Sequence, residues 1–396
     1  HYFVQCYSML SPKGLLKNCL TIILAISSVL VTVDFLTYFG SPSQGISFIP
    51  AYKKNRFQEK LNAAVHYFPR GYNVADPVMG FDIEKNVAPI NFNMADGSFP
   101  IFSNDIGCFD HHNLAEIQKA KSYDYFAGDS FAWGYGNYEQ NIPSTYEKLS
   151  GRFTVKCGII HSGQRHQFEK FQRTVKLIGH LPKRVILTFY ENDVANDYAY
   201  PHTTVIEGYE VDTYKFDTGQ FQLVPRDMNQ IKQDILVGIN PKTQSFSTHI
   251  DAWLDQHSLV WNLLKIGAKT TQGNELATIY GVSEGVNYGK DKDYASAEVT
   301  RKNRAGLDLW INDAKRQNYQ LILVLIPPKI HHANTNFYGG LRDYLDSKGV
   351  RYFDLTKPFH ESKKRSEELY WLNDGHLRNE GNIFVGKFIA EKLKNN

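Results

Sequence analysis

Short apolar runs alternate with stretches of helical spacing from residue 123 to the end of the chain. Runs of about four to eight apolar residues bounded by turn signals are typical of strands that are covered on both faces. Such runs occur at Tyr123–Ala127, Phe153–Ile159, Arg184–Tyr190, Leu321–Ile326 and Val350–Leu355. Between them, apolar residues at helical spacing predict helices at Pro143–Leu149, Gln167–Ile178, Ala305–Arg316 and Ile383–Leu393.

This alternation predicts an α/β fold with a central parallel sheet of about five strands and helices on both faces. Right-handed crossovers would bring the residues that follow each strand to one edge of the sheet. Residues 198–300 interrupt the alternation with a Tyr- and Asp-rich piece, a predicted helix pair at 227–240 and 248–266, and a Gly-rich stretch at 273–292. We interpret these residues as an insertion, and the sequence leaves open whether it forms a lid, a substrate wall or a decoration.

The N-terminal part contains an uncharged apolar segment, Leu20–Val33, which Lys13 and Lys17 precede. Together with the apolar residues after it, the segment approaches the ~20 residues that a bilayer requires. We predict a cytoplasmic N-terminus at 1–14 and a transmembrane anchor or signal segment at 15–39, because basic residues mark the cytoplasmic side. The rest of the chain would then be periplasmic or extracellular, or secreted after cleavage. A buried helix of a soluble domain is the alternative.

Residues 40–100 predict a linker followed by an irregular stretch packed on the main domain, and residues 101–396 predict that domain with its insertion. Glycine and proline interrupt regular structure in the linker, and prolines recur after it. These residues are Gly40, Pro42, Gly45, Pro50, Pro69, Pro77, Pro89 and Pro100.

Composition excludes few classes of protein. The 44 basic and 41 acidic side chains leave a net charge of +3, and no long basic run is present, so we expect no nucleic-acid partner. The 24 Tyr and 25 Phe residues fit either ordinary packing or stacking on carbohydrate. Nothing predicts the oligomeric state.

The four cysteines, Cys6, Cys19, Cys108 and Cys157, form no CxxC motif. For Cys108 and Cys157 we favour two free, partly buried thiols. A disulfide is the alternative if the domain is exported, but spacing alone does not give the distance between the two residues.

Three polar clusters carry the candidate chemistry: Gly128-Asp129-Ser130 and Glu191-Asn192-Asp193 after predicted strands, and Asp374-Gly375-His376 before the last helix. A serine becomes a good nucleophile when a base takes its proton, and a histidine oriented by a carboxylate is such a base. We therefore predict Ser130 as nucleophile, His376 as base and Asp374 as its partner. Asn192 would donate its amide to the oxyanion.

Each cluster taken alone has an ordinary explanation. Short Gly/Asp/Ser turns are common, and a turn asparagine often satisfies its own backbone. Asp374 and His376 could be half of a metal site, but no third ligand has an obvious local spacing, so we expect neither metal nor cofactor.

Together, the clusters resemble the SGNH (GDSL-like) hydrolase superfamily. Phe126–Gly134 (FAGDSFAWG) is similar to its first block, Phe189–Asp193 (FYEND) to its third, and Trp371–His376 (WLNDGH) to its fifth. Asn104–Gly107 resembles a segment that often precedes the first block in extracytoplasmic members. The resemblance covers roughly residues 100–396 apart from most of the insertion. It implies a flavodoxin-like three-layer sandwich and ester chemistry without a metal.

The sequence departs from the family pattern at two blocks. Tyr190 occupies the glycine position of the third block. The second block normally supplies a glycine N–H to the oxyanion hole, and the simplest register places His161 there with Gly163 two residues later. We assign Gly163 to the oxyanion hole, and His161 would line the pocket or be structural. Asp374 is preferred to Asn373 because only the carboxylate is charged.

The resemblance implies an exported serine esterase that hydrolyses O-acyl esters, O-acetyl above all, on a cell-envelope or extracellular glycan. Its partners would be an O-acylated small molecule or polysaccharide and, through the N-terminal segment, the membrane. Two alternatives remain open. The same triad could transfer acetyl groups onto a glycan, or the chain could be a catalytically inactive envelope binding or assembly protein.

Overall fold

The computed structural model describes residues 66, 68–94, 96–217, 222–239, 298–329, 337–371 and 374–394, and also Thr21, Ser28 and Thr32. The chain divides into two units, residues 1–58 with 244–273 and residues 59–243 with 274–396. Of the first unit, only the last three of these residues, all helical, are described. The rest of the predicted membrane segment and the predicted helix at 248–266 lie outside the described residues. Among the helices described, none is long and apolar enough to cross a membrane.

A five-stranded parallel sheet forms the centre of the second unit, in the order β13-β12-β7-β5-β6. Numbered by position along the chain, this order is 2-1-3-4-5, which is the flavodoxin-like order. The strands are β5 (Asp124–Ala127), β6 (Thr154–Lys156), β7 (Arg184–Phe189), β12 (Gln320–Leu325) and β13 (Arg351–Asp354). Each lies within a predicted strand or within one residue of it, and the predicted α/β fold is confirmed.

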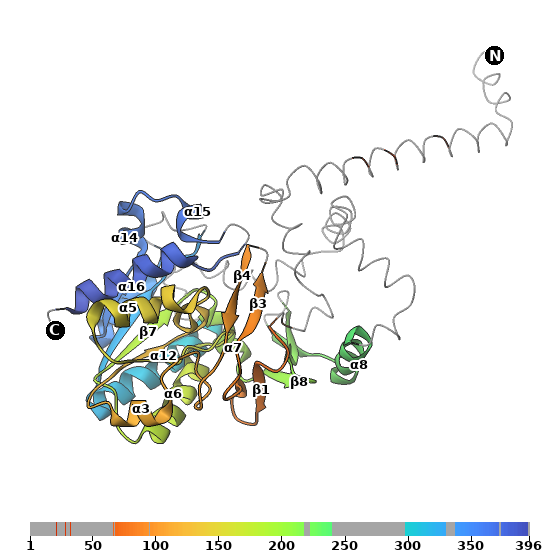
Figure 1. The fold of residues 1–396 in the computed structure, drawn as a ribbon, viewed down its shortest axis with the longest axis horizontal. Helices are drawn as coiled ribbons and strands as arrows, with labels where there is room; N and C mark the ends of the chain where they lie inside the picture. The colour runs from red at the N-terminus through yellow and green to blue at the C-terminus, as the bar shows by residue number, and fades with distance from the viewer. Residues whose placement is uncertain are drawn as a thin grey trace, which may run out of the picture. The chain divides into compact units, whose positions relative to one another are not determined.

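Helices cover both faces of this sheet (Figure 1). One face packs on α6 (Gln164–Ile178) and α12 (Glu298–Gln317), and the other on α5 (Ile142–Ser150) and α16 (Asn379–Leu393). Neighbouring strand residues alternate between the two cores, as Tyr125 and Phe126 do. The strands read as continuous apolar runs because both of their faces are buried.

Capping residues set the ends of several helices. Asn141 accepts a hydrogen bond from the Ser144 N–H at the start of α5, and Pro143 lies in its first turn. Gly151 and Gly179 end α5 and α6 in the left-handed conformation that favours glycine. The shorter helices are α3 (Leu114–Lys119), α4 (Ser130–Trp133), α7 (Asp193–Ala199), α13 (Gly339–Lys348), α14 (Thr356–Glu361) and α15 (Ser366–Leu369), with a 3₁₀ turn at Tyr138–Gln140.

Two antiparallel hairpins occupy residues 73–101, where the sequence predicts irregular structure. They pair β1 (Asn73–Asp76) with β2 (Gly80–Ile83) and β3 (Ile90–Met94) with β4 (Gly97–Ile101). Pro77 lies in a turn and Pro100 in a two-stranded ribbon, positions that tolerate the missing N–H. Apolar residues of both hairpins share a core with Trp133. Proline content is therefore a misleading signal for this segment.

The described part of the insertion forms two further hairpins and a helix. These are β8 (Thr203–Ile206) with β9 (Tyr209–Asp212), β10 (Tyr214–Asp217) with β11 (Gln222–Pro225), and α8 (Met228–Ile239). Helix α8 coincides with the predicted helix at 227–240. Strand β8 packs against β1 and β2, so the insertion and the N-terminal hairpins form one layer beside the sheet (Figure 1).

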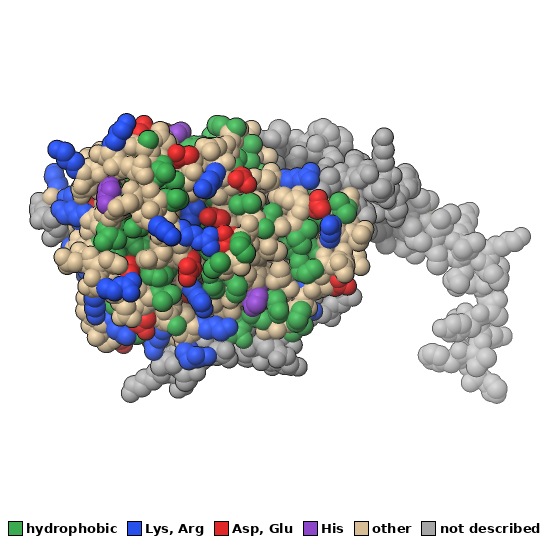
Figure 2. Space-filling view, turned by 90° about the horizontal axis from the view of Figure 1, so that it is seen from below, with side chains coloured by type: hydrophobic (Ala, Val, Ile, Leu, Met, Phe, Trp, Pro, Cys, Tyr) green, Lys and Arg blue, Asp and Glu red, His purple; other side chains and the backbone are tan. Residues whose placement is uncertain are grey.

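Charged side chains of both signs are interspersed on the face shown in Figure 2, and no continuous basic tract is visible among its coloured residues. Ion pairs such as Arg342–Asp354 at 2.6 Å neutralise charge locally in the described chain. The expectation that nucleic acid is no partner stays a prediction.

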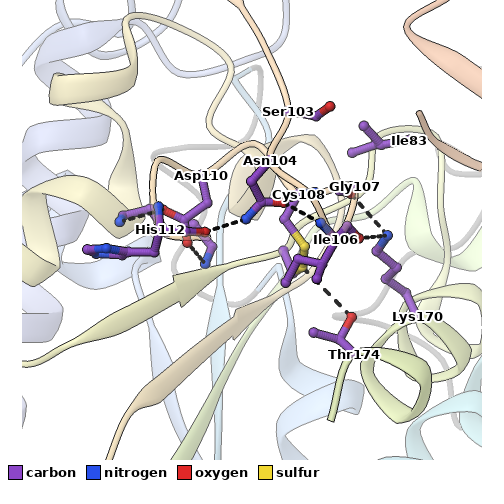
Figure 3. The surroundings of a disulfide bond; sticks show 12 residues. Ile83, Ser103, Asn104, Ile106, Gly107, Cys108, Asp110, His112, Lys170 and Thr174 are labelled. Carbon is purple, nitrogen blue, oxygen red and sulfur yellow. Dashed lines mark hydrogen bonds and ion pairs between the residues drawn. A yellow bond between two sulfur atoms is a disulfide. The ribbon is translucent and has the colours of Figure 1, made fainter. Parts of the chain in front are cut away.

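A disulfide joins Cys108 to Cys157, whose Cα atoms are 4.8 Å apart (Figure 3). The favoured prediction of free thiols is therefore wrong. Asn104 shapes the turn that presents Cys108, because its Oδ1 accepts the Cys108 N–H at 2.9 Å. Lys170 Nζ donates to the Ile106 and Gly107 carbonyls from the other side of the turn (Figure 3). The Asn104 contact is local, but Lys170 is more than 60 residues away in sequence and Cys157 is 49 away, and spacing alone does not reveal that these residues meet.

Reduction of this disulfide is expected to lower the free energy of unfolding by about 2–4 kcal/mol, since the bond closes a loop between residues 49 apart. Urea unfolding with and without dithiothreitol measures the loss. A double variant, Cys108→Ser with Cys157→Ser, should show the same loss and no response to the reductant. A double variant as stable as the oxidised wild type would contradict the expectation.

Candidate active site

The first two polar clusters follow the carboxyl ends of β5 and β7. Ser130 begins α4 just after β5, and Asn192 precedes α7 just after β7. The chain turns to opposite sides of β5 to form β6 and β7, so the crevice between β5 and β7 is a topological switch point. Ligands of open α/β sheets bind at such a point.

The geometry of the turn before Ser130 requires the residue types found there. Gly128 has φ +138°, and a Cβ there would lie 2.0 Å from Thr188 Oγ1, so no other residue fits. Asp129 caps α4, because its Oδ1 accepts the Phe131 N–H at 3.0 Å. The Gly-Asp-Ser sequence thus places Ser130 at the entrance of a short helix.

His376 links Ser130 to Asp374. His376 Nε2 lies 2.7 Å from Ser130 Oγ, and His376 Nδ1 lies 2.5 Å from Asp374 Oδ1. The same Oδ1 accepts the His376 backbone N–H at 2.8 Å. A carboxylate that accepts from Nδ1 leaves the Nε2 lone pair free to accept the serine proton. The structure therefore brings together the nucleophile, base and acid that the sequence predicts.

Two residues that the sequence does not single out hold His376 and its loop. The Tyr135 ring stacks on the imidazole with centroids 3.8 Å apart and planes at 11°. Lys329 Nζ donates to the Trp371 carbonyl at 2.6 Å, and burial lowers the pKa of this lysine. An aromatic face stabilises a cation placed over it, and here the cation would be the imidazolium. No local motif marks either residue, because their partners are distant in sequence.

Asn192 and Asp129 lie together beside Ser130. Burial raises the pKa of Asp129 to about 6, against opposing contributions from the Phe131 N–H, the His376 charge and the Asn192 side chain. Asn192 Oδ1 is buried and receives no hydrogen bond from the described residues. This arrangement places the Asn192 amide within reach of the Asp129 carboxylate, and its role toward an oxyanion stays a prediction.

His161 and Gly163, the two second-block candidates for the oxyanion hole, differ in backbone conformation. His161 has φ +51°, in the left-handed region that favours glycine. Gly163 has φ −98°, and a Cβ there would lie 2.4 Å from Asp197 Oδ1. Gly163 is thus explained by close packing on Asp197. Its assignment to the oxyanion hole stays a prediction.

Buried carboxylates lie behind the candidate site. Asp193 accepts hydrogen bonds from the Gln164 and Gln167 amides, each at 2.9 Å, and burial raises its pKa well above the ordinary value. Asp197 accepts from the Arg165 N–H and from Asn303 Nδ2, and burial raises its pKa to about 7. Both side chains fix helix α7, which begins directly after Asn192.

The raised pKa of Asp197 has a consequence for stability. The folded protein holds the Asp197 proton more tightly than the unfolded chain, so the contribution of Asp197 to the free energy of unfolding falls as pH rises from about 4 to about 7. Asp197→Asn mimics the protonated acid and is expected to reduce that fall by roughly 2–4 kcal/mol. Urea unfolding across this pH range measures it, with the exposed Asp343→Asn as control. Equal pH slopes in variant and wild type would disprove the expectation.

A cavity of about 300 Å³ adjoins the histidine loop and is lined by Asp96, Glu367, Trp371 and Arg378. The backbone N–H of Trp371 donates to the backbone carbonyl of His376 at 3.0 Å, so this lining residue is joined directly to the predicted base. The indole Nε1 of Trp371 is buried and has no acceptor among the described residues. The cavity therefore offers an aromatic side chain and charged groups of both signs.

No protein-family model and no curated protein matches the sequence. The chain is similar to solved structures of esterases and acylhydrolases. One is described as a lipolytic protein of the G-D-S-L family from Desulfitobacterium hafniense, with 14% identity, a TM-score of 0.34, and 69% of this chain and 100% of that chain covered. The second is described as an acylhydrolase from Bacteroides fragilis, with 13% identity, a TM-score of 0.30, and coverage of 71% and 92%.

The third is the acetyl xylan esterase Est2A from Butyrivibrio proteoclasticus, with 10% identity, a TM-score of 0.33, and 69% of this chain and 64% of that chain covered.

Proposed function

We propose that this chain is a serine esterase that hydrolyses O-acyl esters, and O-acetyl esters of a glycan in particular. The observation that carries the proposal is the continuous hydrogen-bonded path from Ser130 Oγ through His376 to Asp374 at the switch point of the sheet. The order of the three residues along the chain and their placement on the elements agree with the SGNH resemblance.

In the proposed reaction, Ser130 Oγ attacks the acyl carbonyl carbon while His376 Nε2 takes the serine proton. The oxyanion receives hydrogen bonds from the Ser130 N–H, the Asn192 amide and an N–H of the second block. The bond to the alcohol breaks as His376 returns the proton to the departing oxygen. Water then attacks the acyl-serine through the same base and releases the carboxylic acid.

The glycan part of the proposal draws on the cavity beside the base. Trp371 lines the cavity with an aromatic side chain of the kind that packs on sugar rings. Asp96, Glu367 and Arg378 surround it with groups that bind hydroxyls. Activity outside the cytoplasm is supported by the Cys108–Cys157 disulfide, a bond that persists in oxidising compartments.

A fluorophosphonate probe and an acetylated xylo-oligosaccharide test the proposal together. We expect the probe to label the wild type but not Ser130→Ala, and free acetate to be released from the oligosaccharide. If folded wild type is not labelled, the chain is a binding or assembly protein instead. If acetyl groups from an activated ester accumulate on an added oligosaccharide beyond the free acetate, the enzyme is a transferase.

The cavity is tested separately with Trp371→Ala. Loss of a sugar contact should raise KM for the acetylated oligosaccharide and leave turnover of a small acetyl ester nearly unchanged. Equal effects on the two substrates would contradict the proposed glycan substrate but would not contradict the proposed esterase activity.

A further inference from the structure

A second cluster of polar side chains lies beside the loop that follows β6. His66, His161 and Glu210 have ligand-type atoms that all lie within 4.8 Å of one another. Asp212 lies next to this group of three, with its Oδ1 3.0 Å from His66 Nε2. Glu210 and Asp212 belong to β9 in the insertion, so three segments that are distant in sequence meet here. The ester chemistry proposed above uses none of these side chains.

The donor types suit a first-row divalent metal. Imidazole nitrogens with a carboxylate oxygen form a set that holds zinc in proteins. Around a tetrahedral zinc with bonds of about 2.0–2.2 Å, ligand atoms lie about 3.3–3.5 Å apart. Here His161 Nδ1 lies 2.7 Å and His66 Nε2 lies 3.8 Å from Glu210 Oε1. Side-chain shifts of less than about 1 Å would bring these two distances to the tetrahedral value, and Asp212 would move in as the fourth ligand.

The surroundings preorganise these ligands. Asn73 Nδ2 donates to Glu210 Oε2 at 2.5 Å, which leaves Oε1 facing the two histidines. Such outer hydrogen bonds orient the ligands of metal sites. Glu210 is only 1% exposed, and a buried carboxylate requires a positive partner. His66 Nε2 is buried and lies 3.0 Å from Asp212 Oδ1, within ion-pair distance.

We propose that His66, His161, Glu210 and Asp212 bind one structural zinc ion. The two carboxylates balance the charge of the ion, and the two imidazoles bind it as neutral ligands. The ion would tie strand β9 and the segment before β1 to the second block. It would thereby hold His161 at φ +51° in a loop whose Ile159 N–H donates to the Gly128 carbonyl at 3.0 Å.

Zinc binding to the full chain tests the proposal directly. The protein is stripped with EDTA and titrated with zinc in competition with a chromophoric chelator. We expect one stoichiometric site in the wild type, and binding at least about tenfold weaker in His161→Ala and in Glu210→Gln. Glu210→Gln keeps the size of the side chain, so a folded variant is expected. The matched control is His360→Ala, because this histidine is exposed on α14.

Two further readouts separate metal binding from a purely structural role. Zinc should raise the melting temperature of the wild type but not of Glu210→Gln, and Co²⁺ should give the absorption bands of a tetrahedral site. Ser130→Ala should bind zinc like the wild type, because the zinc site does not include Ser130. A chain without esterase activity could therefore still bind zinc at this site. Zinc binding that is absent from the wild type, or unchanged in both variants, overturns the proposal.

Discussion

Ser130→Ala is expected to lower kcat/KM for an activated acetyl ester by at least about 10⁴-fold. The reason is that Ser130 Oγ is the atom 2.7 Å from His376 Nε2, where the base takes the proton of the nucleophile. His376→Ala should cost a similar factor, and the double variant should be little worse than either, because the two residues act as one unit. Steady-state hydrolysis with burst analysis measures these changes.

The matched control for this substitution is Ser347→Ala, at an exposed serine of α13. It should keep wild-type activity, and circular dichroism with urea unfolding should show that Ser130→Ala is folded. Near-normal turnover by folded Ser130→Ala would mean that another group attacks the ester, and the proposed mechanism would be wrong.

The central fold was predictable from sequence because its signals are local. Runs such as Arg184–Tyr190 are mainly apolar on both strand faces because helices cover both faces of the sheet, and such a run indicates a buried strand without further context. Ser130 and Asn192 were predictable for the same reason: each follows such a run, and parallel strands bring those positions to one edge.

Other features depend on contacts that no local pattern encodes. The Cys108–Cys157 bond needs the turn held by Asn104 and Lys170, which come from separate segments. Tyr135 stacks on His376, which is more than 200 residues away in the sequence. No local sequence pattern therefore predicts this contact. The hairpins at 73–101 bury apolar residues against Trp133, and they accommodate Pro77 in a turn and Pro100 in a two-stranded ribbon.

Two substitutions at Asp374 should separate its charge from its geometry. Asp374 Oδ1 alone accepts from both the backbone N–H and Nδ1 of His376, while Oδ2 lies 3.5 Å from the Tyr135 hydroxyl. An asparagine can keep its carbonyl oxygen in the first position and direct its NH₂ to the Tyr135 oxygen. Asp374→Asn therefore preserves the tautomer of His376 and removes only the negative charge.

The charge sets the expected size of the loss. A unit charge about 4 Å from the imidazolium is worth roughly 4 kcal/mol at an effective dielectric of about 20, and partial exposure of Asp374 reduces this figure. Asp374→Asn should thus lower kcat by about 10²-fold with little change in KM. Asp374→Ala also frees the imidazole to rotate and to change tautomer, and should lower kcat by about 10³–10⁴-fold.

Steady-state kinetics of both variants measure the difference, with Asp343→Asn as the matched control. Equal losses in the two Asp374 variants would mean that charge alone accounts for the contribution of this residue. Wild-type rates in both would exclude Asp374 as the partner of His376. A larger loss in Asp374→Ala is the expected result, because the same oxygen that stabilises the imidazolium also fixes the ring beneath Tyr135.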